Sequence, residues 1–86
     1  DGQVPVGGHN MDPDAVRRLL VERPEVLDAR VEAISRNGTS RVEATIAPAK
    51  DISIDAWPER VREWLDGKVP SHAIPKAVYL SGGLLS

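Results

Sequence analysis

The sequence predicts an α+β fold: a small sheet of about three strands with two or three helices packed on it, preceded by a short β-turn segment. Two stretches carry apolar residues at the spacing of an amphipathic helix. Two other stretches alternate apolar and polar residues, and the Asn37-Gly38 pair between them is typical of a hairpin turn. A chain of 86 residues has room for one small domain.

The opening segment, residues 1–11, reads as an extended chain that turns at Gly7-Gly8. A helix is expected to start next, because Asp12 can accept hydrogen bonds from free backbone N–H groups and Pro13 has no N–H to leave unpaired. A stripe at helical spacing follows: Val16, Leu19, Leu20 and Arg23. Pro24 ends this helix.

Two strands are predicted after the first helix. Residues 26–34 place Ala29, Val31 and Ala33 on one face. Residues 41–47 alternate in the same way, through Val42, Ala44 and Ile46. We expect an antiparallel pair with one face toward water, joined at Asn37-Gly38 or by a slightly longer loop over residues 37–40.

A second helix is expected after a loop at 49–54, with Asp55 as its capping residue. Its apolar stripe is Trp57, Val61, Trp64 and Leu65, so both tryptophans are predicted to pack in the core. Asp66-Gly67 ends this helix. Residues 77–80 read as the last strand, after a stretch that contains two prolines.

The composition excludes several classes of protein. Apolar residues make up 41% of the chain, which is too many for a disordered chain. The net charge is −2 with both signs mixed, so the chain lacks the clustered Lys and Arg of a nucleic-acid-binding protein. The absence of cysteine excludes disulfides and thiolate metal sites and fits a cytoplasmic protein. No apolar run is long enough to span a membrane, so no membrane partner is expected.

The glycines and histidines do not form a recognisable site. The stretch GQVPVGG has the spacing of neither a P-loop nor a dinucleotide-binding loop, so a plain turn is the favoured interpretation. His9 and His72 stand far apart, with no carboxylate at ligand spacing beside either, and a zinc site needs three or four ligands. We therefore predict surface or loop histidines and no metal site.

The charged side chains are also given structural roles. Asp12 and Asp55 stand at helix starts, where capping accounts for them. Arg17, Arg18 and Arg23 could hold phosphate, but they are interleaved with glutamates and are interpreted as a solvated helix face. No GxSxG motif supports a hydrolytic triad. The residues alone show no self-contained active site.

Three stretches in a fixed order carry a resemblance to a known family: DGQVPVGGHNMD, VRRLLVERPEVLDARV and VREWLDGKVPSHAIPKAVYL. They are similar to the hinge signature, the helix and strand that follow it, and a later segment of the adenylate-forming enzymes. That superfamily comprises acyl-CoA and aryl-CoA synthetases, peptide-synthetase adenylation domains and luciferases. The matching positions are Asp1, Gln3, Val4, Gly8, Leu20, Pro24, Val26, Ala29, Val31, Pro70, Ile74 and Pro75.

The resemblance implies that residues 1–86 are the small C-terminal lid subdomain of such an enzyme. Asp1 and Gly2 would form the hinge, and residues 1–11 would be the hinge-proximal segment with its glycine loop. Residues 12–80 would form the α+β body, and residues 81–86 a truncated tail before the expected catalytic-lysine loop. The loop beside the thiol tunnel would be Val6, Gly7, Gly8 and His9.

No catalytic residue is expected within this chain. The lysine of the family follows the last strand in a P-x-T-x-x-G-K stretch, and Lys68 lies before the last strand, so Lys68 is rejected as its equivalent. The resemblance implies ATP and Mg²⁺ as cofactors of the parent enzyme, not bound by this fragment alone. It also implies two partners, a large N-terminal adenylation domain and either CoA or a phosphopantetheinyl carrier protein.

The implied function is that of a mobile subdomain in an ATP-dependent acyl-activating ligase. It would close the active site for adenylation and rotate for thioester formation. The alternative is a non-catalytic, stand-alone protein-interaction or docking module with a degenerate lid fold.

Overall fold

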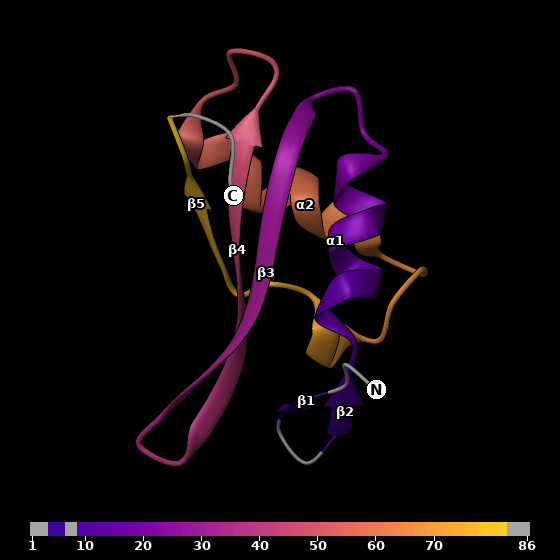
Figure 1. Ribbon diagram of the computed structural model, residues 1–86, viewed down its shortest axis with the longest axis vertical. Helices are drawn as coiled ribbons and strands as arrows, with labels where there is room; N and C mark the ends of the chain where they lie inside the picture. The colour runs from indigo at the N-terminus through magenta and orange to yellow at the C-terminus, as the bar shows by residue number, and fades with distance from the viewer. Residues whose placement is uncertain (1–3, 7–8, 83–86) are drawn as a thin grey trace.

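The computed structural model describes residues 4–6 and 9–82 (Figure 1). The element bounds in chain order are β1 Val4–Val6, β2 His9–Met11, α1 Pro13–Val21, β3 Val26–Arg36, β4 Thr39–Pro48, the 3₁₀ turn η1 Ile54–Ala56, α2 Trp57–Leu65, the 3₁₀ turn η2 Ser71–Ala73 and β5 Ala77–Leu80. The predicted α+β fold, with two helices on a three-stranded sheet, is confirmed.

The main sheet has the strand order β3-β4-β5 and is mixed. Strands β3 and β4 pair antiparallel, as predicted, whereas β5 lies parallel to β4. A parallel neighbour needs a crossover connection, and the chain between β4 and β5 supplies one that contains α2. The sequence predicted β5 but not its direction. Strands β1 and β2 form a separate two-stranded sheet.

Both helices bury their apolar stripes on one face of the main sheet. Val31 stands opposite Ala44 and Ala29 opposite Ile46, so alternate residues of the two strands share that face. The largest side chains buried in this core are Trp57, Leu20, Ile46, Leu65, Val16, Val42 and Val61. On the other face Arg30 stands opposite Thr45 and Glu32 opposite Glu43, so that face is polar.

The tryptophans pack as predicted, one fully and one partly. Trp57 is completely buried, and its ring meets that of Trp64 edge to face with 5.9 Å between centroids. Trp64 is half-buried, and the Arg23 guanidinium lies 5.0 Å from the centre of its ring. Arg23 therefore covers an aromatic ring, where a purely solvated arginine was expected.

The turn between β3 and β4 contains only Asn37 and Gly38. Arg36 pairs with Thr39, so the alternative prediction of a longer loop over residues 37–40 is wrong. Asn37 has φ of +52° and Gly38 has φ of +78°, so both occupy the left-handed region that a type I′ turn requires. The strands run to the turn on both sides and exceed the predicted 26–34 and 41–47.

The two helix starts differ. At α1 the Asp14 N–H donates to Asp12 Oδ1 at 3.0 Å, which confirms Asp12 as the cap. At α2 the prediction of Asp55 as the cap is wrong, because Asp55 lies inside η1 and no side chain caps either η1 or α2. The 3₁₀ turn leads directly into α2, so the chain reaches the helix already wound.

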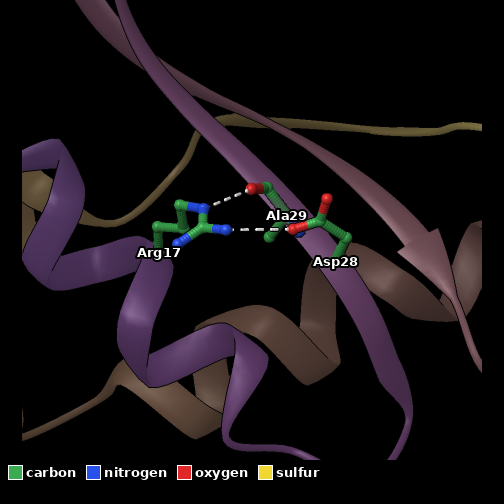
Figure 2. Close-up of polar contacts among 3 residues, drawn as sticks. All are labelled: Arg17, Asp28 and Ala29. Atoms are coloured by element: carbon green, nitrogen blue, oxygen red, sulfur yellow. Dashed lines mark hydrogen bonds and ion pairs between the residues drawn. The ribbon is translucent and has the colours of Figure 1, made fainter. Parts of the chain in front are cut away.

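Arg17 corrects the expectation of a solvated helix face. Its Nε donates to the Ala29 carbonyl at 2.9 Å, and an Nη donates to the Asp28 carboxylate at 3.2 Å (Figure 2). Arg17 thus links α1 to β3 by hydrogen bonds, although its side chain is partly exposed to solvent. Arg18 does lie at the surface, where it bonds the Asp14 carboxylate at 2.6 Å. Within the described residues, no helix is long and apolar enough to cross a membrane.

Candidate functional site: the hairpin and its anchors

The hairpin β1–β2 lies at one end of the molecule (Figure 1). Val4 pairs with Met11 and Val6 with His9, so the structure brings Val6 and His9 opposite each other. They are the last paired residues on either side of Gly7 and Gly8. Gly7 and Gly8 lie outside the described residues, as do the predicted hinge residues Asp1 and Gly2.

Packing fixes the hairpin to the α+β body at Met11. The Met11 side chain is only 4% exposed and belongs to the core cluster that contains Val16 and Ala73. Strand β1 also packs against β3 and β4. The resemblance and the local pattern predicted an extended segment here, but they gave no sign of how it attaches.

A hydrogen bond from η2 makes the second attachment. His72 Nε2 lies 3.0 Å from the Asn10 carbonyl oxygen, and since a carbonyl can only accept, Nε2 carries the hydrogen and donates it. The predicted loop position of His72 is correct, although its side chain is half-buried. The sequence did not indicate this contact, because the partners are 62 residues apart and the acceptor is a backbone group.

A hollow of about 290 Å³ lies between the hairpin, the start of α1 and the loop after α2. Its lining residues are Asn10, Met11, Asp12, Ala15, Val16, Lys68, Val69, Pro70, His72 and Ala73. The Lys68 side chain is exposed at its border, before β5. Among these lining residues, Met11, Val16 and Ala73 are buried, whereas Asp12 and His72 are half-buried.

Metal-ligating side chains are not clustered in the described part of the chain. No three His, Cys, Asp or Glu side chains among residues 4–6 and 9–82 are grouped to hold a metal ion. The hydrogen bond to Asp14 and the charge of that carboxylate raise the pKa of the Arg18 guanidinium, whose side chain is exposed. The main feature of this region is a short hairpin, two residues of which, Asn10 and Met11, line a small hollow.

Neither a protein-family model nor a curated protein sequence matches this chain significantly. Several solved structures do match this chain in fold. The o-succinylbenzoate CoA synthetase MenE from Bacillus subtilis matches 95% of this chain with 16% identity and a TM-score of 0.78. The amide bond synthetase McbA from Marinactinospora thermotolerans matches 99% with 21% identity and a TM-score of 0.82. The anthranilate CoA ligase AuaEII, in complex with anthranoyl-AMP, matches 100% with 20% identity and a TM-score of 0.81.

This chain spans about one sixth of the length of these enzymes, since the matches cover 16%, 17% and 16% of them. The structural neighbours of the chain are thus adenylate-forming synthetases, whose chains are far longer. The fold of residues 4–6 and 9–82 is that of one segment of such synthetases, as the resemblance in the sequence implies.

Proposed function

We propose that this chain is the mobile C-terminal subdomain of an ATP-dependent acyl-activating ligase. One observation carries the proposal: nearly the whole chain shares its fold with one segment of several acyl-CoA and aryl-CoA ligases. The order of the three sequence stretches that resemble the family supports the same assignment. The likeness in sequence motifs and the likeness in fold thus agree over the same residues.

The reaction of such a ligase has two steps. A carboxylate oxygen of the acid attacks the α-phosphate of ATP, pyrophosphate leaves and an acyl-adenylate forms. The sulfur of a thiol then attacks the acyl carbon, the bond to AMP breaks and the thiol proton goes to solvent. Each step develops charge at a different atom, so groups that stabilise one transition state are not placed for the other. A subdomain that changes position between the steps can place different groups at the reacting atoms in each step.

The architecture suits a part that moves as one body. Both helices share a single core with the sheet, and Met11 and His72 fix the hairpin to that core. We propose that Asp1 and Gly2 form the hinge, since glycine tolerates backbone angles that other residues do not. The hairpin would then bring the loop from Val6 to His9 beside the thiol in the second step.

ATP and Mg²⁺ would be held by a large N-terminal domain of the parent enzyme. When bound, Mg²⁺ would neutralise charge on the ATP phosphates. The acceptor would be the thiol of CoA or of a carrier-protein pantetheine, and the enzyme would act in the cytoplasm.

Deletion from the parent protein tests the proposal. The parent gene is expressed with and without residues 1–86, and two rates are measured: acid-dependent pyrophosphate exchange and thioester release. We expect the deletion to abolish thioester release, because the hairpin that would lie beside the thiol in the second step would be missing. Unchanged thioester release would refute the assignment. A parent sequence without a large domain upstream of Asp1 would instead favour the docking module.

A further inference from the structure

The hairpin β1–β2 is too short to keep its shape by itself. Each of its strands has three residues, and an isolated two-stranded hairpin is at best marginally stable in water. Its orientation must therefore come from its attachments to the body. The described contacts are the burial of Met11, the packing of β1 against β3 and β4, and the hydrogen bond from His72.

These attachments do different things. Met11 anchors one point of β2 in the core by its side chain, and apolar contacts have little directional preference. The bond from His72 Nε2 to the Asn10 carbonyl is directional and acts on the adjoining residue. A point anchor together with a directional bond beside it restricts rotation of the strand about the anchor.

The donor itself is rigidly placed. His72 lies in the middle of η2, whose backbone is closed by the bond from the Ala73 N–H to the Pro70 carbonyl at 2.9 Å. Ala73 is only 2% exposed and Pro75 is buried, so both fix the turn against the core. Because η2 is held against the core, the hydrogen bond from the His72 ring fixes the backbone of β2 relative to the core.

We propose that His72 is a positioning residue that holds the hairpin β1–β2 in the orientation needed for thioester formation. This inference rests on the function proposed above. Without the donor, water would satisfy the exposed carbonyl of Asn10, so the body would stay folded while the hairpin would sample other orientations. The thiol step would slow, and the adenylation step would not.

The test uses the parent enzyme with His72→Ala, His72→Gln and Ser71→Ala. Ser71 is the matched control, because it lies exposed in the same turn and its side chain makes no described bond. We expect His72→Ala to lower kcat for thioester release about fivefold, the value of one neutral hydrogen bond. Pyrophosphate exchange and the KM values for ATP and acid should stay as in the wild type.

His72→Gln should restore most of the lost rate, since its amide N–H can donate to the same carbonyl. Equal loss in both half-reactions together with a lowered melting temperature would show a merely structural role and overturn the inference. Unchanged thioester release in His72→Ala would also overturn it. Both results differ from failure of the proposed function, in which deletion of residues 1–86 itself leaves thioester release intact.

Discussion

The α+β body, residues 12–80, and the hairpin β1–β2 differ in what holds them together. In the body, two helices and three strands share one apolar cluster in which Leu20, Ile46 and Trp57 have no exposed surface. Of the two hairpin residues whose burial the structure describes, Met11 belongs to that cluster and Asn10 is exposed, and the Asn10 carbonyl accepts the bond from His72. Close packing in a shared core makes the body rigid, whereas the orientation of a segment held by few contacts can change when a single residue is replaced.

The comparison separates stability from function within one small chain. Substitutions in the body are expected to change the free energy of unfolding, and substitutions at the attachments of the hairpin are expected to change, in addition, the local exchange of β1 and β2. The following variants test that separation, in order of expected effect.

Leu20→Ala should have the largest effect. Leu20 is fully buried between α1 and the sheet, and truncation of a buried leucine costs about 3 kcal/mol through lost burial and an internal cavity. Such a loss is a large part of the stability of a domain this small. Urea unfolding followed by circular dichroism measures it. A loss below about 1 kcal/mol would mean that α1 is not integral to the core.

Met11→Ala should cost less, about 2 kcal/mol, because Met11 lies at the border of the core beside the hollow. The distinguishing readout is amide hydrogen exchange: β1 and β2 should exchange faster, and β3 and β4 should change only with global stability. Asn10→Ala is the matched control, since that side chain is exposed and the carbonyl remains. Uniformly faster exchange throughout the chain would contradict the separation of hairpin from body.

Arg17→Ala should cost about 1 kcal/mol, because two hydrogen bonds from α1 to β3 are lost at a partly exposed site. Arg18→Ala is the control on the same helix, and we expect it to leave the unfolding midpoint unchanged, since that ion pair is exposed to solvent. Thermal unfolding at low and high salt compares them. Equal effects of the two variants would show that the contact with β3 adds nothing.

Gly38→Ala should cost about 1 kcal/mol, because a Cβ disfavours the left-handed conformation that Gly38 holds in the turn. No atom stands within 4 Å of the added carbon, so the cost comes from the backbone alone. Gly82→Ala adds a carbon in equally open space without a positive φ and should be neutral. Chemical denaturation measures the cost of each variant, and equal unfolding midpoints would contradict the left-handed conformation of Gly38.

The sequence predicted what short-range patterns control. Helical spacing marked the stripes of α1 and α2, and alternation with Asn37-Gly38 marked β3 and β4. The cap at Asp12 was correct because capping is local, while Asp55 failed because a preceding 3₁₀ turn replaces a side-chain cap.

What the sequence could not predict depends on distant partners. The parallel direction of β5 depends on the crossover through α2, and the role of Arg17 depends on a carbonyl and a carboxylate of β3. The bond from His72 to the Asn10 carbonyl joins two ends of the domain. For the candidate loop, Val6 and His9 were predicted from the resemblance, and their pairing across β1 and β2 is a finding of the structure.

The proposed movement of the subdomain is tested most directly by energy transfer between two dyes. The chain contains no cysteine, so Ser35→Cys places a single dye label on exposed β3 near the turn, and a second dye is placed on the large domain of the parent enzyme. Energy transfer between the dyes is then recorded before and after acid and ATP form the acyl-adenylate. We predict two distances, with the population shifting when the adenylate forms. A single distance that stays the same through both half-reactions would contradict the account.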